Sequence, residues 1–266
     1  MPLAVCATPI GNLDDVTLRV LAELRGADVV LCEDTRHTRG LLERHGIEAR
    51  LLSYHEHNEA RRTAELLPRL EAGERIALVS DAGLPGISDP GGRLVRAALA
   101  AGVPVTVLPG PSAVETALVA SGLVGERYQF LGFLPRGEAA LRRLWEELRA
   151  WPWPAVAFES PQRLPATLRA LAVADPEREL AVCRELTKRF EEVARGTAAD
   201  LAERFASPPK GEITLVLGPS LGEPDEAAAL AAVLELVDAG LPRRRAADLV
   251  ARLTGVARNR LYRSSL

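Results

Sequence analysis

The sequence predicts an α/β protein made of two consecutive α/β domains and a small helical C-terminal module. Short apolar runs alternate with amphipathic stretches of helical period from the first residues, and the alternation resumes after a glycine-containing break near residues 122–126. The last part of the chain is helical in pattern throughout. At 266 residues and 47% hydrophobic composition the chain is long enough for two domains. We expect the boundaries to give domains 1–122 and 123–222 and a module 223–266.

In the first domain, apolar runs of strand length are separated by helical stretches, which is typical of a parallel sheet. The expected strands are residues 3–7, 28–32, 75–79 and 103–107. The expected helices lie near 16–26, 35–45, 57–72, 91–101 and 112–121. Because ligands of open parallel sheets bind beyond the carboxyl ends of the strands, the loops that follow these strands are where a site is expected.

The second domain repeats the pattern, and the module is built differently. Strands are expected near 128–133, 154–159, 179–184 and 212–218, with helices near 138–149, 162–173 and 198–206. Residues 218–224 read as a linker. In the module we expect a helix from Arg243 to Leu253, a turn at 254–256 and a short helix to Arg263. Its expected apolar stripe consists of Ala246, Leu249, Val250, Leu253 and Leu261.

Composition narrows the class of protein. The sequence has no apolar run long enough to span a membrane and no basic, apolar leader at its start, so we expect a cytoplasmic protein without membrane contact. The three cysteines are scattered, which argues against a disulfide framework and against a zinc site and predicts buried thiols. We therefore expect no metal.

Charge is distributed unevenly along the chain. Residues 241–266 contain seven arginines and one acidic residue, Asp248, and so carry +6, whereas the whole chain carries −3. A basic tail on an acidic body favours a polyanionic partner. The tail also has a simpler interpretation as a solubilising helical cap. Lys188 and Lys210 are the only lysines in the sequence, which marks both positions for attention.

The stretch SDAGLPGISDPGG, residues 80–92, follows an expected strand and precedes an expected helix. Its glycines permit close approach of the backbone to a ligand, but their spacing fits neither the dinucleotide fingerprint nor the phosphate loop. A structural turn is the alternative, with Asp89 as helix cap and Pro90 in the first turn. That interpretation accounts for Asp89 and Pro90 but not for residues 80–88. An anionic Asp81 suits a cationic ligand.

Other distinctive loops follow expected strands at residues 8–13, 33–38, 108–113 and 158–161, so all are expected at one edge of the sheets. At these loops the sequence resembles the tetrapyrrole methylase superfamily, in particular its ribosomal small-subunit methyltransferase I branch. The similar stretches are TPIGNLDDVTLRVL, EDTRHTRGLL, SYHEHNE, SDAGLPGISDPG, LPGPSA, ESPQR, RELTKRFEE and KGEITLV. SDAGLPG takes the place of the superfamily's G-D-P-x-x-x-G loop, with Ser80 and Ala82 replacing Gly and Pro. LPRRRAADLVARLTGVARNRLY resembles the branch's helix-turn-helix-like module.

The resemblance implies a function and a set of binding residues. It implies 2'-O-methylation of a cytidine in the decoding region of 16S rRNA, with S-adenosylmethionine bound between the two α/β domains and the 16S rRNA or small ribosomal subunit as partner. It also implies a homodimer. The cofactor-binding residues that it implies are Pro9, Gly11, Asp81, Gly83, Ile87, Ser88, Ser112, Ala113, Glu159, Glu212 and Ile213.

Methyl transfer to a hydroxyl requires alignment of the oxygen and, at most, removal of one proton, because the cofactor supplies the electrophile. The expected catalytic residues are Asp34, His37 and Lys188. Asp34 can instead be a helix cap, and Lys188 can hold phosphate, stabilise an alkoxide or be simply solvated. The expected substrate-binding residues are Arg36, His55, His57, Arg243, Arg244 and Arg245. His55 and His57 are equally well read as surface residues before a helix.

Two other functions stay open at this point. One is a C-methyltransferase acting on a tetrapyrrole or corrinoid precursor, which would share fold and cofactor. The other is a non-catalytic RNA-binding assembly factor. The +6 tail and the EDTRHT stretch favour RNA over a small macrocycle, and the complete set of loops favours catalysis.

Overall fold

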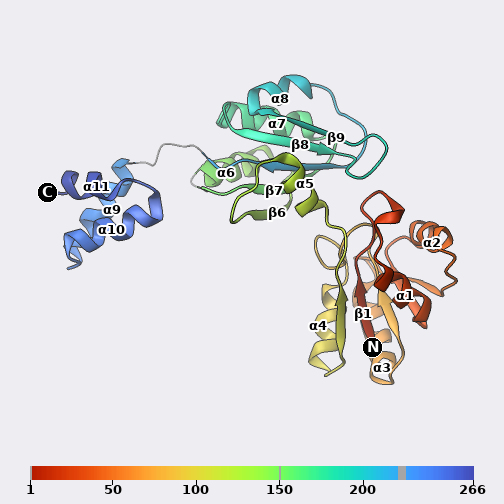
Figure 1. Cartoon of the computed structure of the whole chain (residues 1–266). Coiled ribbons are helices and arrows are strands. Elements are labelled where there is room, and N and C mark those ends of the chain that lie inside the picture. The colour runs from red at the N-terminus through yellow and green to blue at the C-terminus, as the bar shows by residue number, and fades with distance from the viewer. Residues whose placement is uncertain (1, 150, 221–225) are drawn as a thin grey trace.

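The computed structural model describes residues 2–149, 151–220 and 226–266. They form two α/β units followed by a group of helices, and each unit, a sheet with the helices that cover it, is called a layer below. Figure 1 shows the first sheet and its helices in red to yellow, the second in green to cyan, and the C-terminal helices in blue. The α/β class and the helical module predicted from the sequence are confirmed.

The first sheet is wholly parallel, as predicted, with strand order β3-β2-β4-β1-β5. Its strands are β1 (Leu3–Cys6), β2 (Val29–Cys32), β3 (Leu51–Ser53), β4 (Ile76–Leu78) and β5 (Val105–Leu108). The connecting helices are the 3-10 helix η1 (Leu13–Asp15), α1 (Leu18–Gly26), α2 (Thr35–Arg44), α3 (Glu59–Glu71) and α4 (Gly92–Ala100). Because all strands are parallel, the loops after β1, β2 and β4 meet at one edge of the sheet.

Alternation along the central strands builds a core on each face of this sheet. Ala4, Val30 and Ala77 pack on one side with α1 and α2, and Leu3 and Val29 pack on the other with α3 and α4. Strands buried on both faces carry apolar residues at every position, which is why the runs LAVC and VVLC were recognisable in the sequence.

The second sheet is mixed, with strand order β6-β7-β10-β8-β9. Its strands are β6 (Gln129–Phe133), β7 (Ala155–Glu159), β8 (Glu179–Arg184), β9 (Glu192–Thr197) and β10 (Ile213–Leu217). The helices of this part are α5 (Ala113–Ser121), α6 (Glu138–Arg149), α7 (Leu164–Ala174) and α8 (Ala198–Arg204). β10 runs antiparallel to β7 and β8, so the start of β10 lies beside the ends of both.

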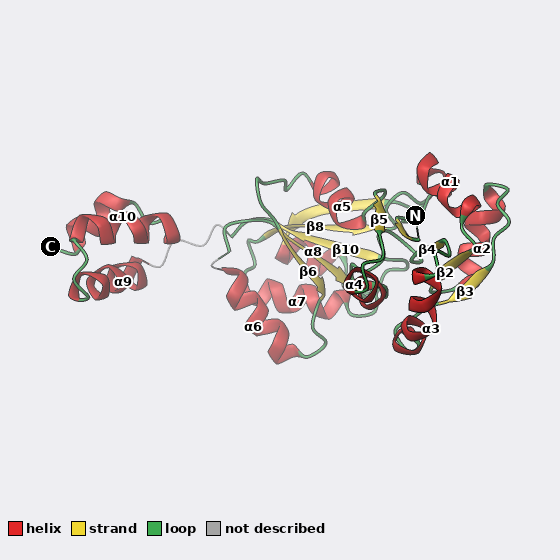
Figure 2. Cartoon of the chain, turned by 90° about the horizontal axis from the view of Figure 1, so that it is seen from below, coloured by secondary structure: helices red, strands yellow, loops and turns green. Residues whose placement is uncertain are grey.

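Helix α5 covers one face of the second sheet, and α6 to α8 cover the other (Figure 2). Val114, Ala117 and Leu118 of α5 pack on Val156 and Val216 of that sheet. The sequence assigned α5 to the first domain, whereas its packing joins it to the second sheet. The domain boundaries remain a prediction, but the chain passes from one sheet to the other before α5.

Two strands were not predicted from the sequence, and one predicted helix cap was wrong. Strands β3 and β9 were missed, since β3 is short and only half-buried and β9 (EVARGT) is largely polar. Helix α4 has Gly91 as N-cap, at φ +132°, so Asp89 and Pro90 lie outside the helix and Asp89 is not its cap. The three thiols are free and buried, as predicted.

The C-terminal helices α9 (Glu226–Asp238), α10 (Arg243–Thr254) and α11 (Arg258–Ser264) pack on one another. Val233, Ala246, Val250 and Leu261 lie in their shared core, and Gly255 ends α10 in the left-handed conformation. Leu253, expected on the apolar stripe, is 76% exposed, so this assignment was wrong. Among the described residues, no helix combines the length and apolar composition needed to cross a membrane.

Candidate active site

A cavity of about 750 Å3 is lined by loops of both α/β layers. The first layer contributes Ile10, residues 81–84 and 87–89, and the turn after β5. The second contributes the start of α5, residues of β6, the ends of β7 and β8, and the start of β10. The predicted cofactor residues that line it are Asp81, Gly83, Ile87, Ser88, Ser112, Ala113, Glu159, Glu212 and Ile213. Glu159, Glu212 and Ile213 lie together because β10 is antiparallel to β7, so that Ile213 pairs directly with Glu159.

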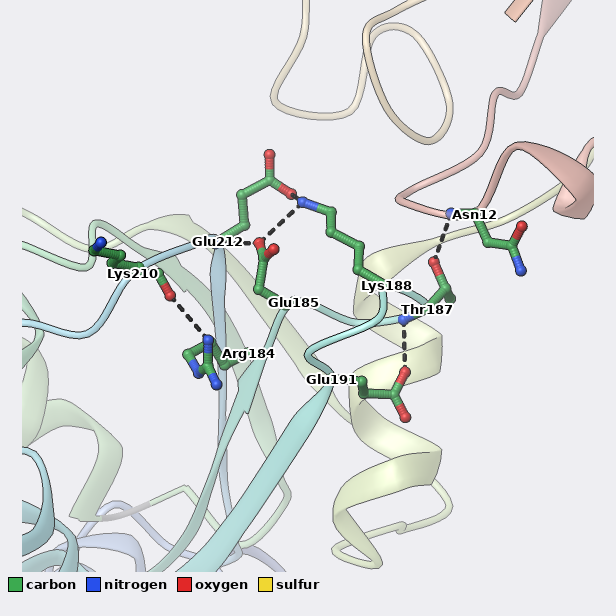
Figure 3. A network of polar contacts seen from close by, with 8 residues as sticks. All are labelled: Asn12, Arg184, Glu185, Thr187, Lys188, Glu191, Lys210 and Glu212. Atoms are coloured by element: carbon green, nitrogen blue, oxygen red, sulfur yellow. Dashed lines mark hydrogen bonds and ion pairs between the residues drawn. The ribbon is translucent and has the colours of Figure 1, made fainter. Parts of the chain in front are cut away.

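Pro9 and Gly11 are placed differently from the other predicted cofactor residues. They are not among the residues that line the cavity. Gly11 lies against the loop after β8, where an added Cβ would come within 2.8 Å of the carbonyl oxygen of Leu186. The neighbouring Asn12 amide donates to Thr187 Oγ1 over 3.0 Å (Figure 3). Gly11 and Asn12 therefore join the two layers beside the cavity.

The glycine loop is fastened to the end of β1. Thr8 and Gly83 exchange two backbone hydrogen bonds, of 2.8 and 3.0 Å from nitrogen to oxygen, and Thr8 Oγ1 donates to the Ser80 carbonyl over 3.0 Å. Gly83 and Gly86 have φ of +76° and +87°, which glycine adopts without strain. Ser88 adopts φ +63° without being glycine. Three residues of this loop thus have a positive φ at or beside the cavity wall.

Carboxylates gather on the first-layer wall. Asp81 and Asp89 line the cavity, and Glu33 interacts electrostatically with both. Burial, then the charges of Glu33 and Asp81, raise the pKa of Asp89 to about 6, against a lowering hydrogen bond from Ser80. Burial, followed by Asp81, also raises the pKa of Glu33. This accumulation of negative charge favours a cationic ligand.

The second-layer wall is aromatic, which was not predicted from the sequence. Tyr128, Phe130, Phe133 and Phe158 line the cavity. The Phe158 ring lies edge-to-face with those of Phe130 and Phe133, at centroid distances of 5.1 and 5.4 Å. One signal was available, since Phe158 directly precedes the ESPQR stretch, but nothing in the sequence placed β6 beside it.

Two glutamates of the cavity wall already have partners. Glu115, which was not predicted as a site residue, accepts hydrogen bonds from Ser112 and, over 2.6 Å, from Tyr128. The buried Glu159 carboxylate accepts from the Ser160 amide over 2.6 Å and Thr167 Oγ1 over 2.5 Å. It also pairs with Arg163. The Glu159 side chain therefore anchors the ESPQR loop.

Lys188 is held by two carboxylates at the edge of the site (Figure 3). Its Nζ lies 3.0 Å from Glu185 Oε1 and 2.8 Å from Glu212 Oε2. Burial lowers the pKa of Lys188, but the hydrogen bonds with Glu212 and Glu185 outweigh it, so the net direction is upward. Lys188 is not among the lining residues, although its partner Glu212 is. Lys210 contributes its carbonyl oxygen, which accepts from Arg184 over 3.2 Å.

The polar contacts of Asp34 in the EDTRHT loop are mainly with the start of helix α2. Asp34 caps α2 by accepting from the Arg36 amide over 2.8 Å, and its other oxygen lies 2.8 Å from Arg36 Nη2. These hydrogen bonds hold the pKa of Asp34 far below its usual range. The Asp34 amide donates to Asp81 Oδ1 over 3.1 Å, which links this loop to the cavity wall. Arg36 and His37 are exposed, and none of Asp34, Arg36 and His37 lines the cavity.

The remaining predicted substrate residues lie in two places. His55 follows β3, its Nε2 is 3.0 Å from Asn58 Nδ2, and its ring is 5.9 Å from that of His57. In the module, Arg243 donates to the Ser265 carbonyl, whereas Arg244 and Arg245 are exposed. Within the described part of the chain, no group of His, Cys, Asp and Glu is arranged to hold a metal ion.

Comparisons with known proteins agree with this arrangement. A model of the tetrapyrrole (corrin/porphyrin) methylases matches residues 2–202, and a model of the RsmI C-terminal helix-turn-helix domain matches residues 223–266. The chain is 46% identical to the ribosomal RNA small subunit methyltransferase I of Mesorhizobium japonicum, over 99% of this chain and 91% of that protein. It is 41% identical to the protein of the same name from Escherichia coli O157:H7, over 99% and 94%.

A solved structure shows the same fold at lower identity. Uroporphyrin-III C-methyltransferase from Thermus thermophilus, crystallised with S-adenosylhomocysteine, superposes with a TM-score of 0.57 at 19% identity, over 81% of this chain and 96% of that one. The two model matches cover the first α/β layer, the second as far as residue 202, and the helical module, and the two relatives cover nearly the whole chain. The chain therefore belongs to the tetrapyrrole (corrin/porphyrin) methylase family and, within it, to the ribosomal RNA small subunit methyltransferase I group.

Proposed function

We propose that the protein transfers a methyl group from S-adenosylmethionine to the 2'-hydroxyl of a cytidine in the decoding region of 16S rRNA, presented as rRNA or as small ribosomal subunit. The observation that carries the proposal is the cavity, with carboxylates on one wall and aromatic rings on the other. Family membership supports methyl transfer, and the names of the relatives support small-subunit rRNA as the substrate.

The residues present fit this cofactor. Its sulfonium carries a positive charge, for which Asp81 and Asp89 supply counter-charge at the cavity wall. Gly83 and Ala113 are small, so a ligand can approach the backbone closely. Ile213 and the Glu159 backbone border the second-layer side. When bound, S-adenosylmethionine supplies an activated methyl group.

The protein's part is then alignment and acceptance of one proton from the ribose hydroxyl. Of the sequence-predicted catalytic residues, Asp34 is bound by Arg36, Lys188 is bound by Glu185 and Glu212, and His37 lies outside the cavity wall. Asp89 lies in that wall, and its raised pKa makes it a better proton acceptor than an ordinary carboxylate while it remains ionised at neutral pH. We place the proton acceptor at Asp89.

Label transfer tests the proposal. Small subunits lacking the modification are incubated with the protein and methyl-labelled S-adenosylmethionine, and Ala113→Trp serves as a variant that fills the cavity. We expect label in 16S rRNA with the wild-type protein and none with Ala113→Trp. Cofactor and RNA binding without transfer would support the assembly-factor alternative. If a tetrapyrrole precursor is offered in a parallel assay, label in that precursor only would support the C-methyltransferase alternative.

We propose further that the protein is a homodimer, which rests on the resemblance, and that it is cytoplasmic, which rests on the composition of the sequence. Sedimentation at micromolar concentration is expected to show a species of two chains. A single-chain species throughout would reject the dimer.

A further inference from the structure

Phe133 is exposed although it lines the cavity. Its side chain is a large aromatic group, yet 63% of the residue is accessible, whereas Phe130 on the same strand is partly buried. Exposure of a large apolar ring at the rim of a ligand cavity marks a surface that a ligand can cover.

A β-bulge places this ring. In a regular strand, residues three apart point to opposite faces of the sheet. Phe130 pairs with Val156 and Phe133 with Phe158, so three steps along β6 oppose two along β7. Gly132, at φ +67°, lies within the irregularity. As a result Phe130 and Phe133 both contact Phe158. Bulges commonly re-aim a side chain beside an active site.

The position of the bulge joins the ring to the glycine loop. A Cβ added at Gly132 would lie 3.9 Å from Ser88 Oγ, so the bulge of β6 borders the loop that carries Asp89. The Phe133 ring is supported at 5.4 Å by the edge-to-face contact with Phe158. A supported yet accessible ring next to the reaction cavity is suited to stacking with a flat ligand.

We propose that Phe133 is the platform on which the nucleobase of the target nucleotide stacks, which holds its ribose at the cavity. This inference rests on the proposed function, because it requires a nucleotide substrate. Single-stranded RNA bases are commonly bound on aromatic side chains, and such stacking contributes about 1–3 kcal/mol per base. The recognised group is thus an unstacked base of any identity, and Phe133 is a residue that positions the substrate.

Methylation kinetics of Phe133 variants on small-subunit rRNA test the inference, with cofactor affinity measured separately by equilibrium dialysis. For Phe133→Ala we expect kcat/KM for RNA to fall by about 5-fold to 150-fold, which is the stacking energy above converted to a rate ratio. Cofactor affinity should stay within twofold. Phe133→Tyr should keep most of the activity, and Phe133→Leu, which is apolar but has no π face, should not.

Phe190→Ala is the matched control, because Phe190 is 66% exposed but does not line the cavity. It should leave kcat/KM unchanged. Normal kinetics of Phe133→Ala beside an active wild type would overturn the inference alone. Weakened cofactor binding would assign the ring to the cofactor, and a change of oligomeric state would assign it to a second copy; either result overturns the inference. A wild type that transfers no methyl group would instead refute the proposed function, and the inference with it.

Discussion

The backbone amide of Asn12 donates a hydrogen bond to Thr187 Oγ1, 175 residues away in the sequence, and so links the first α/β layer to the second. Gly11 sits at the same contact, where an added Cβ would lie 2.5 Å from Lys188 Cγ and 2.8 Å from both Thr187 Oγ1 and the Leu186 carbonyl oxygen. The approach of the two layers at this point therefore depends on a residue without a side chain.

Gly11→Ala should disturb this contact and the cavity beside it. The added methyl group overpacks the interface, which costs about 1–3 kcal/mol and forces the loop at residues 186–188 to move. We expect cofactor affinity to fall by about tenfold in a calorimetric titration. Gly40→Ala is the control, because Gly40 lies in α2 with no atom within 4 Å of an added Cβ. It should leave affinity unchanged and stabilise the fold by about 0.5–1 kcal/mol. Equal affinities for the two variants would contradict the role of Gly11.

Gly83→Val should abolish cofactor binding. Gly83 lines the cavity at φ +76°, so a branched side chain there strains the loop and enters the ligand's space. Gly102→Val is matched in strain, since Gly102 has φ +73°, but an added Cβ there has no neighbour within 4 Å. Both variants should lose stability, and only Gly83→Val should lose binding. Unchanged affinity in a folded Gly83→Val protein would refute the placement of the cofactor.

Asp89→Asn should stabilise the protein at neutral pH. The folded-state pKa of Asp89, about 6, exceeds the ordinary value of 3.8, so folding favours its neutral form. Ionisation of Asp89 therefore lowers the free energy of unfolding. This loss of stability is absent below pH 3.8, grows as the pH rises and is complete above pH 6. Urea unfolding is therefore expected to show Asp89→Asn more stable than wild type at pH 7.5, with a smaller difference at pH 4.5.

Asp34→Asn is the control for Asp89→Asn, and its effect on stability is expected to be the opposite. Hydrogen bonds from Arg36 lower the pKa of Asp34, so ionised Asp34 stabilises the folded state above pH 3.8. Asp34→Asn should be the less stable protein at both pH values. In activity assays, the acidic limb of the wild-type pH profile should follow Asp89, and Asp89→Asn should lose both that limb and most of kcat. A variant with wild-type kcat would exclude Asp89 as the proton acceptor.

Arg244 and Arg245 should contribute to RNA binding through phosphates. Both are exposed and, among the described residues, neither has an ion-pair partner, whereas Arg252 pairs with Asp248. For single-stranded RNA each lost phosphate contact flattens the slope of log affinity against log salt by about 0.7. We expect Arg244→Gln with Arg245→Gln to lower the slope by about 1.4 and Arg252→Gln to change it less. A slope unchanged by the double substitution would favour the interpretation of the module as a solubilising cap.

Much of the fold could be predicted because the central strands of the first sheet are buried on both faces and read as continuous apolar runs. Strand β9 could not, because its residues are largely polar and its partner β8 sets its place. The antiparallel course of β10 was equally hidden, although it brings Ile213 beside Glu159.

The site was predictable where a loop carries its own signal. Residues 81–88 stand out by their glycines, and all of them except Pro85 and Gly86 line the cavity. Asp89 was read as a cap because Asp-Pro before an apolar stretch is typical of a helix start, but α4 begins later, at Gly92. Phe133 depends on a bulge, and the pairing of Lys188 depends on Glu212, far away in sequence. Such relationships arise only in the folded chain.

Mapping the modified nucleotide tests the central claim most directly. Small subunits from cells lacking this modification are incubated with the protein and S-adenosylmethionine, and the 16S rRNA is digested and analysed by mass spectrometry. We predict a single new 2'-O-methylcytidine in the decoding region, strongly reduced when Asp89→Asn replaces the wild type and absent when Gly83→Val does. A methyl group on a base, on another RNA or on no RNA at all would contradict the account.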